Sequence, residues 1–199
     1  MKVVLASQNQ NKIREMRLIL SEIGIEVLSQ QEAGVNLDPE ETGTTFEENA
    51  RIKAEAVMQA TGLPAIADDS GLMVDALDGA PGVYSARYGG PGLNDTDRWK
   101  LLLKNMQDKE DRSCRSVSVI HCAFPDGTCL SARGECPGVL IREAKGDGGF
   151  GYDPIFWLPE LRKTMAQITM EEKNRISHRA KALERFQKEW ENTQHGTDQ

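Results

Sequence analysis

The chain opens with Lys2-Val3-Val4-Leu5-Ala6-Ser7-Gln8-Asn9-Gln10-Asn11-Lys12, which passes from an apolar run to a polar one. The apolar run, residues 2–6, predicts a short buried strand. The polar run leads into a helix, because the next apolar side chains recur every three or four residues and a glycine follows the last of them. These side chains are Ile13, Met16, Leu20 and Ile23, and the glycine is Gly24. A buried strand joined to an amphipathic helix is the expected start of an α/β fold.

Strands and helices continue to alternate along the rest of the chain. We expect further helices at residues 45–60, from Asp95 onward and from Thr169 to Trp190. We expect further strands at residues 26–28, 63–67, 72–77, 116–124, 129–134 and 139–142. No internal repeat or linker interrupts this pattern, so the sequence predicts a single α/β domain over residues 1–199.

Size and composition describe an ordinary globular protein. The 199 residues suffice for one domain, or for two lobes that share a core. Hydrophobic residues make up 39% of the chain, yet no apolar run approaches the length of a signal peptide core or a membrane span. We therefore expect a cytoplasmic protein with no membrane partner. The four cysteines include no Cys-x-x-Cys pair, so we expect reduced thiols and no zinc site.

The charge of the chain limits its ligands. A formal net charge of −7 disfavours tight binding to nucleic acid, which depends on Lys and Arg displacing counterions, so we expect no nucleic-acid partner. A phosphate would have to meet local positive charge. The turn Ser7–Lys12 offers this, since a helix begins there with free N–H groups and Lys12 adds a full charge. The turn lacks the spacing of a Walker loop, and an ordinary capped helix start is the alternative.

Two neighbouring carboxylates follow the expected strand at residues 63–67. Asp68 and Asp69 stand where ligands gather at an open α/β sheet. With Glu40 or Glu41 brought near, they would suit Mg²⁺, which accepts one or two carboxylates and completes its octahedron with water and phosphate oxygens. A turn closed by an Asx hydrogen bond is the alternative. Ser70 is not a candidate nucleophile, because no Gly-x-Ser-x-Gly elbow surrounds it.

Two basic features need a partner or solvent. Lys53 falls on or beside the apolar stripe of the helix at residues 45–60, so its ammonium either reaches out to water or meets an anion. Several donors cluster within two turns of the last helix, and a solvated basic face is the alternative explanation for them. These donors are Lys173, Ser177, His178 and Arg179.

The segment at residues 146–156 reads Gly-Asp-Gly-Gly-Phe-Gly-Tyr-Asp-Pro-Ile-Phe. Its glycines let the backbone approach a ligand closely, while Phe150 can stack on a heterocycle and Asp153 can accept an N–H. The segment therefore suits a flat ligand. A glycine-rich loop with one buried ring is the alternative.

Taken together, these segments resemble the noncanonical purine nucleoside triphosphate pyrophosphatases, also called inosine triphosphate or dITP/XTP pyrophosphatases. Family members often carry Thr and Gly at the positions where this chain has Ser7 and Gln8. The resemblance runs from Val3 to about Leu183. It rests on Ser7-x-Asn9-x-x-Lys12, Glu40-Glu41-Thr42-Gly43, Phe46-x-x-Asn49-Ala50, Ala67-Asp68-Asp69-Ser70-Gly71-Leu72, Gly79-Ala80-Pro81-Gly82-x-Tyr84-Ser85-Ala86-Arg87, Gly148-Gly149-Phe150-Gly151-Tyr152-Asp153-Pro154 and Ser177-His178-Arg179.

The resemblance implies a fold and an activity. The expected fold is a mixed, elongated central sheet flanked by helices, in two lobes with the active-site cleft between them. The expected reaction is Mg²⁺-dependent hydrolysis of ITP, dITP and XTP to the monophosphate and pyrophosphate, which removes deaminated purines from the nucleotide pool. A homodimer is also implied, with residues 84–88 and the glycine-rich loop after them as candidate contacts.

The resemblance also implies roles for residues. Glu40 and Asp69 would hold Mg²⁺, and Asp69 would orient or deprotonate the attacking water, with Lys53 as a second catalytic residue. Phe150 would stack on the purine. The polar edge of the base would meet Asp153, His178 and Arg179, and Arg179 facing O6 would reject adenine. The triphosphate would be bound by Ser7, Gln8, Asn9, Gln10, Asn11, Lys12, Lys53 and Lys173, with Ser70, Arg87, Gly151 and Tyr152 as further substrate contacts.

Overall fold

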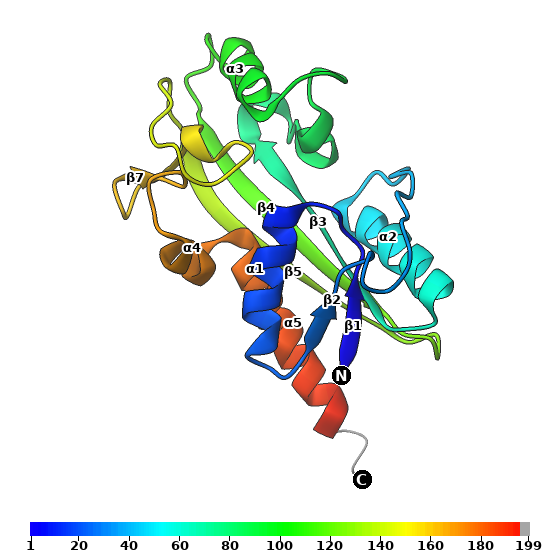
Figure 1. Cartoon of the computed structure of the whole chain (residues 1–199). Coiled ribbons are helices and arrows are strands. Elements are labelled where there is room, and N and C mark those ends of the chain that lie inside the picture. The colour runs from blue at the N-terminus through cyan, green and yellow to red at the C-terminus, as the bar shows by residue number, and fades with distance from the viewer. Residues whose placement is uncertain (196–199) are drawn as a thin grey trace. The chain divides into compact units, whose positions relative to one another are not determined.

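The computed structural model describes residues 1–195, whose strands form one sheet in the order β2-β1-β3-β4-β5-β6-β7 (Figure 1). The strands are β1 Lys2–Leu5, β2 Glu26–Leu28, β3 Ala65–Val74, β4 Ser113–Ala123, β5 Cys129–Leu140, β6 Phe156–Leu158 and β7 Lys163–Thr164. β1 pairs in parallel with β2 and β3, whereas β6 pairs antiparallel with β5 and β7, so the sheet is mixed. The predicted mixed α/β class is confirmed.

The helices begin and end at the capping residues that their sequences supply. Thr45 accepts a hydrogen bond from the N–H of Glu48 at the start of α2, and Gly62 ends that helix with a φ of 67°. A capping box of Thr169 and Glu172 opens α4. The α-helices are α1 Gln10–Ser21, α2 Phe46–Thr61, α3 Asp95–Asn105, α4 Met170–Ile176 and α5 His178–His195, and the 3-10 helices are η1 Asp75–Leu77, η2 Gly82–Arg87 and η3 Asp153–Ile155.

The chain divides into two compact units. The first unit comprises Met1–Asp69, Ser118–Gly134 and the chain from Arg179 onward, and the second comprises Ser70–Val117 and Glu135–His178. β3, β4 and β5 each contribute residues to both units. Two lobes agree with the sequence-based expectation, and their folding as one domain stays a prediction.

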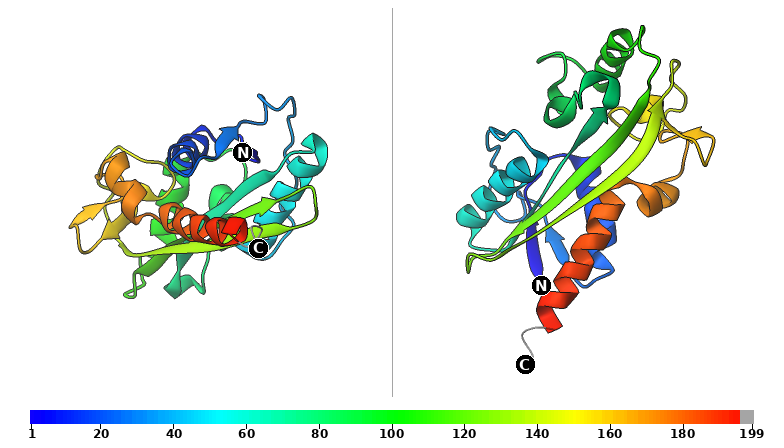
Figure 2. Two further views of the ribbon diagram at one scale, coloured as in Figure 1. Left: turned by 90° about the horizontal axis from the view of Figure 1, so that it is seen from below. Right: turned by 180° about the vertical axis from the view of Figure 1, so that it is seen from behind.

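The first unit has two cores because the side chains of β1 alternate in direction. Val3 and Leu5 pack with α1 and α5, whereas Val4 packs with α2. β1 accordingly lies between α1 and α2 in Figure 1 and in the right-hand view of Figure 2. The predicted stripe of α1 is confirmed for Ile13, Met16 and Leu20, which are buried in the first core. Complete burial of a side chain such as Leu20 contributes about 1.5–3 kcal/mol.

The second unit has a core of its own around α3 and β5. Leu102 and Met106 are fully buried and belong to the same cluster as Val74 of β3 and Phe156 of β6. Gly138 in β5 makes this packing possible, because a Cβ at that position would lie 2.5 Å from the ring of Phe156. The glycine therefore serves a close approach within the sheet rather than a turn.

Two predicted strand boundaries are wrong. β3 runs without a break through Asp68 and Asp69 as a single strand, although the Asp-Asp-Ser-Gly sequence predicts a turn between two strands. β5 likewise continues through Pro137 and Gly138 to Leu140, where the sequence predicts two separate strands. The ion pairs of Asp68 in β3, and the packing of Gly138 against Phe156 in β5, outweigh the local preference of turn-forming residues.

The last predicted helix is interrupted. Ser177 adopts an extended conformation with a ψ of 158°, which separates α4 from α5. The sequence predicts one continuous helix from Thr169 to Trp190, and that prediction is wrong at this residue. Ser177 is itself buried, so the interruption lies inside the packed protein and redirects the chain just before Arg179.

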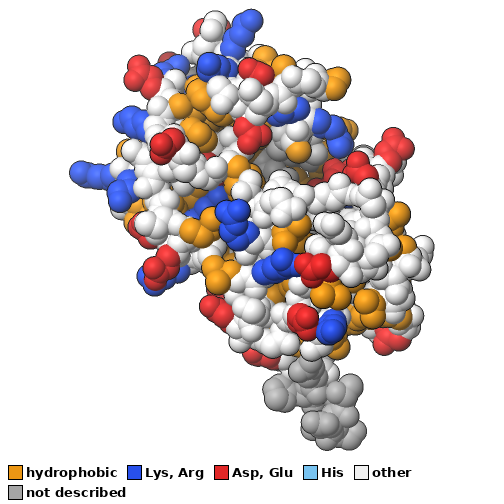
Figure 3. Space-filling view, viewed as in Figure 1, with side chains coloured by type: hydrophobic (Ala, Val, Ile, Leu, Met, Phe, Trp, Pro, Cys, Tyr) orange, Lys and Arg blue, Asp and Glu red, His pale blue; other side chains and the backbone are white. Residues whose placement is uncertain are grey.

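The surface carries charges of both signs. Lys and Arg side chains alternate with Asp and Glu over the face shown in Figure 3, so this face presents no extended basic patch. Within residues 1–195, no helix combines the length and the apolar character needed to cross a bilayer.

The four cysteines are free thiols, and they should differ sharply in reactivity. Burial raises the pKa of Cys114 and of Cys122 to about 12, and Cys136 is also buried, whereas Cys129 is exposed. Because the thiolate is the reactive form, we expect an alkylating reagent at pH 8 to label Cys129 alone in the folded protein. Intact mass should show one adduct per chain, and none in Cys129→Ser. Labelling of several sites before unfolding would contradict this burial pattern.

His121 in β4 should make stability depend on pH. Its side chain is 6% exposed, and burial lowers its pKa from 6.5, with Arg51 acting in the same direction and Glu55 opposing it. A histidine with a lowered pKa in the folded state binds its proton more readily when unfolded, so stability falls as pH falls below about 6.5. We expect the melting temperature of wild type to decline more steeply than that of His121→Gln between pH 7.5 and 5. Parallel declines would exclude this role.

Candidate functional site

The turn between β1 and α1 is a capped helix start, and residues 8–11 of it are exposed. The side chain of Asn9 accepts hydrogen bonds from the N–H groups of Asn11 and Lys12, while the Ser7 hydroxyl accepts from the N–H of Asn9. Gln8 reaches the Asn36 side chain at 2.6 Å. These hydrogen bonds agree with the capped helix start, and phosphate binding by this turn stays a prediction. Ser7, Gln8 and Gln10 also border a cavity of about 790 Å³ within the first unit.

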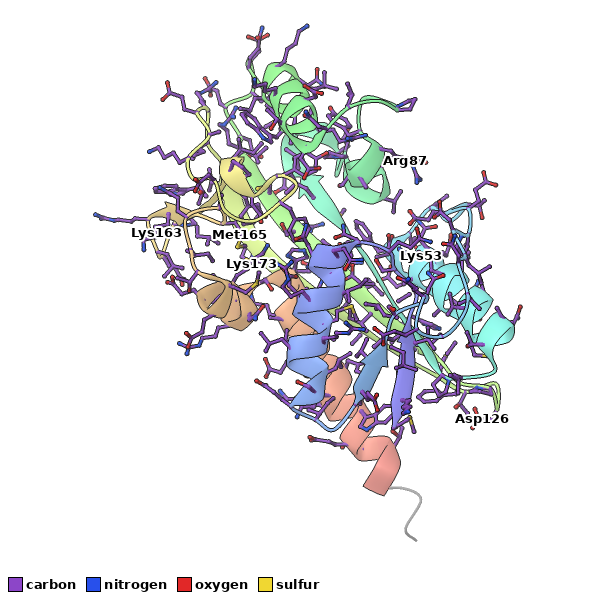
Figure 4. All side chains as sticks on the ribbon, in the orientation of Figure 1. Lys53, Arg87, Asp126, Lys163, Met165 and Lys173 are labelled. Carbon is purple, nitrogen blue, oxygen red and sulfur yellow. The ribbon has the colours of Figure 1, made fainter. Side chains whose placement is uncertain are left out.

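Lys53 meets anions, as one of the two sequence interpretations predicts. From α2, its ammonium lies 3.2 Å from Oδ1 of Asp69 and 3.2 Å from Oε1 of Glu41, and it donates to the carbonyl oxygen of Asp68 at 2.8 Å. Lys53 is labelled in Figure 4. Burial alone would lower the pKa of Lys53, but the three acidic residues raise it on balance. Lys53 therefore stays charged and holds two carboxylates close together.

The two neighbouring aspartates have opposite electrostatic environments. Burial would raise the pKa of Asp68, but the charges of Arg179 and Lys12 hold it well below its usual range. Burial raises the pKa of Asp69 to about 6, because Lys53 only partly offsets the burial and Glu41 adds to the rise. Carboxylates whose pKa values are driven apart in this way commonly serve different purposes. Asp68 is a permanent anion, whereas Asp69 can exchange a proton near neutral pH.

The residues around Asp69 fit a hard cation. Oδ2 of Asp69 is buried and accepts no hydrogen bond within residues 1–195, which is the condition expected of an oxygen reserved for a ligand. Glu41 is held near Asp69 through Lys53, whereas Glu40 is exposed. No three His, Cys, Asp or Glu residues of the described chain form a metal-binding group. The arrangement suits Mg²⁺ bound through one or two carboxylates, with water and phosphate oxygens as the other ligands.

Asp68, the residue before Asp69, belongs to a buried network of ion pairs. Oδ2 of Asp68 accepts from Nε of Arg179 at 3.1 Å and from the Ser118 hydroxyl at 2.5 Å, and its Oδ1 lies 2.8 Å from the ammonium of Lys12. The guanidinium of Arg179 also contacts Glu15, and Arg179 is only 1% exposed. Arg179 thus belongs to the first unit as the partner of two carboxylates. The solvated basic face proposed as an alternative is wrong for this residue.

Sequence reasoning overlooked Glu15 and Ser118. Glu15 is 3% exposed on α1 and lies between the buried positions Ile13 and Met16. A carboxylate on the apolar side of an amphipathic helix is costly unless paired, and that position was the available signal. Ser118 carries no comparable signal, since serine is common in strands and its partner Asp68 lies 50 residues away.

The glycine-rich segment forms a second group of contacts, in the second unit. Oδ2 of Asp153 accepts from the N–H of Phe150 at 3.0 Å and pairs with the ammonium of Lys173 at 2.9 Å. The same ammonium lies 4.4 Å from the centroid of the Phe150 ring, which is a cation–π distance. Lys173 is 4% exposed, so a solvated face does not describe it either. The structure thus brings Lys173 together with Phe150 and Asp153.

The remaining sequence-derived candidates are spread over both units. Arg87 is exposed at the end of η2 with its guanidinium 5.1 Å from the centroid of the Tyr84 ring, and Figure 4 labels it there. Ser70 is half-buried in β3, and His178 is half-buried at the start of α5. Two members of the glycine-rich segment have partners outside it: the N–H of Gly151 donates to Asp95, and the Tyr152 hydroxyl donates to the carbonyl oxygen of Ser85. Asp95 was also overlooked in the sequence, where it reads only as a helix start.

Comparison with known proteins gives a consistent result. A family model described as the Ham1 family matches residues 3–189. The dITP/XTP pyrophosphatase of Desulfotalea psychrophila is 50% identical over 181 residues, covering 91% of this chain and 81% of the relative. The dITP/XTP pyrophosphatase of Pectobacterium atrosepticum is 50% identical over 188 residues, covering 92% and 94%. The structure of the Staphylococcus aureus Ham1 protein is similar with a TM-score of 0.88 and 42% identity, covering 97% of this chain and 100% of that one.

Proposed function

Because this chain belongs to the Ham1 family, we propose that it hydrolyses dITP, XTP and ITP to the nucleoside monophosphate and pyrophosphate. The observation that carries the proposal is the buried Asp69 carboxylate, which has one oxygen paired with Lys53 and the other without a hydrogen bond in the described chain. A site that binds a polyphosphate and activates water needs such an acceptor beside fixed positive charge.

The first unit would bind the phosphates. The donors at residues 7–12 and the ammonium groups of Lys12 and Lys53 supply positive charge in a chain that is acidic overall. Lys12 is held by Asp68 at 2.8 Å, so its position is set before the substrate arrives. Preorganised charge of this kind stabilises the negative charge that gathers on the leaving pyrophosphate.

Asp69 would act as the general base. In the metal-free protein its pKa of about 6 leaves it ionised above neutral pH, so its free oxygen can accept a proton from water or bind a cation. Mg²⁺, bound through Asp69 with Glu41 or Glu40, would neutralise phosphate charge and lower the pKa of bound water. Lys53 would orient Asp69 through Oδ1, leaving Oδ2 for the metal or the water.

The second unit would bind the base. Phe150 offers a ring for stacking, and Asp153 and His178 offer polar groups. Since Lys173 pairs with Asp153 and lies over Phe150, we place it at the base rather than at the phosphates. A hypoxanthine or xanthine base presents O6 as an acceptor and N1–H as a donor, whereas adenine presents the reverse. Each buried mismatch costs about 1–3 kcal/mol, or roughly tenfold to hundredfold in selectivity.

The wider setting follows from this activity. We propose that the enzyme removes deaminated purines from the cytoplasmic nucleotide pool before they enter DNA or RNA. We also propose that both units form one catalytic domain with the substrate cleft between its lobes, and that the enzyme is a homodimer. A nucleotide-bound crystal structure and light scattering would test these two points.

A substrate panel tests the proposal directly. Pyrophosphate release is measured for ITP, dITP, XTP, GTP, ATP and dUTP, each with Mg²⁺ and with EDTA. We expect Mg²⁺-dependent turnover of the 6-oxo purines that lack a 2-amino group, with ATP slower by about 10²-fold or more. Preference for dUTP would indicate a pyrimidine enzyme. No turnover of any nucleotide would leave a binding module as the better explanation.

A further inference from the structure

A carboxylate outside the glycine-rich segment holds the backbone of that segment. Asp95 is the first residue of α3, and its Oδ2 accepts a hydrogen bond from the N–H of Gly151 at 2.9 Å, across 56 residues of sequence. Both residues belong to the second unit. Gly151 has a φ of 62°, and a Cβ there would meet no atom within 4 Å. The surrounding space would admit a side chain, so the restraint on this peptide is the hydrogen bond that Asp95 accepts from it.

Three successive residues of the segment are each held by a different hydrogen bond. The N–H of Phe150 donates to Asp153, the N–H of Gly151 donates to Asp95, and the hydroxyl of Tyr152 donates to the Ser85 carbonyl oxygen. Asp153 lies within the segment, and its carboxylate is paired with Lys173 of α4 at 2.9 Å. Asp95 and Ser85 belong to other elements, so they connect the segment to the rest of the second unit.

The helix that carries Asp95 is firmly anchored. Leu102 of α3 is fully buried in the core of the second unit, and Asn94 and Asp97 form a capping box at its start. Arg98 of the same helix donates to the carbonyl oxygens of Leu93 and Gly90. Because the donor of the contact lies in a glycine-rich turn and the acceptor lies on a packed helix, the helix sets the position and the turn follows it.

We propose that Asp95 is a positioning residue for purine recognition. By holding the N–H of Gly151, it fixes the peptide next to Phe150 and thereby the direction of the ring that would stack on the base. This inference rests on the proposed function, in which Phe150 contacts the purine. Positioned rings bind with less loss of conformational freedom, so the effect should appear in substrate affinity rather than in the chemical step.

Three variants separate this role from a general effect on α3. Asp95→Ala removes the acceptor, and Asp95→Asn keeps an oxygen that can accept from Gly151. Asp97→Ala removes a neighbouring acidic residue whose carboxylate accepts from the N–H of Asn94 in the capping box. For Asp95→Ala we expect KM for ITP to rise by about 3–10-fold, kcat to stay within twofold, and the ITP to ATP selectivity to fall. We expect Asp95→Asn to restore KM to within about twofold of wild type. Asp97→Ala should lower the melting temperature and leave KM unchanged.

Calorimetric titration with IMP gives a second readout that does not depend on hydrolysis. The dissociation constant for IMP should rise in Asp95→Ala by the same factor as KM. Equal KM values for Asp95→Ala and wild type, or equal effects of Asp95→Ala and Asp97→Ala, would overturn the positioning role while leaving the proposed activity intact. Wild type that neither hydrolyses ITP nor binds IMP would overturn both proposals.

Discussion

Asp69→Asn should lower the turnover of ITP by about 10³-fold or more, because it removes the general base and a metal ligand in one isosteric change. Binding should survive, since the phosphate donors of residues 7–12 and Lys53 remain. Lys53 keeps its contacts with Glu41 and with the carbonyl oxygen of Asp68. Pyrophosphate release measures the first effect, and calorimetric titration of the variant with ITP measures the second. Turnover at the wild-type rate would refute the assignment of Asp69.

The same variant should be more stable than wild type when metal is absent. Asp69 has a folded-state pKa of about 6, above its ordinary value of 3.8. A carboxylate with a raised pKa favours the fold at low pH and disfavours it as pH rises through the folded pKa. At pH 8 in EDTA, Asp69→Asn should therefore melt a few degrees above wild type, and this gain should shrink toward pH 4. If Asp69→Asn melted below wild type at pH 8, the lost turnover would reflect damaged structure rather than the loss of a catalytic group.

The parts of the fold that follow a local pattern could be predicted from sequence. The stripe of α1 and the capping box of α4 depend on residues within one or two turns of each other, so spacing suffices to recognise them. Lys53 was also informative, because a lysine on an apolar stripe needs an explanation and its anionic partners were one of two possible answers. The structure identifies those partners as Asp69 and Glu41.

The parts that depend on distant residues could not be predicted in the same way. β3 continues through Asp68 because that carboxylate is paired with Arg179, 111 residues later, and with Lys12. No local pattern indicates such a pairing. The Asp-Asp-Ser-Gly sequence therefore predicts a turn, although the strand continues through it. The interruption at Ser177 likewise could not be predicted from nearby residues, because it is linked to the ion pair between Arg179 and the distant Asp68.

Arg179→Ala should destabilise the protein by about 3–5 kcal/mol, because it leaves the buried carboxylates of Asp68 and Glu15 without their shared cation. For a chain of this size we expect the melting temperature to fall by roughly 10 °C. Arg175→Ala is a matched control, since the Arg175 side chain is 73% exposed and pairs with Glu171 on the same helix. An exposed pair of this kind contributes about 0.3–0.5 kcal/mol.

The pH dependence of this loss identifies its cause. In wild type, Arg179 and Lys12 hold the pKa of Asp68 well below its usual range. Without Arg179, burial dominates and the folded-state pKa of Asp68 rises, so ionisation of the carboxylate opposes folding as pH increases. The deficit relative to wild type should therefore be larger at pH 8 than at pH 5, as measured by thermal or urea unfolding. If Arg179→Ala were as stable as Arg175→Ala while its ITP to ATP selectivity collapsed, Arg179 would serve the base, as the sequence resemblance implies, and not the buried network.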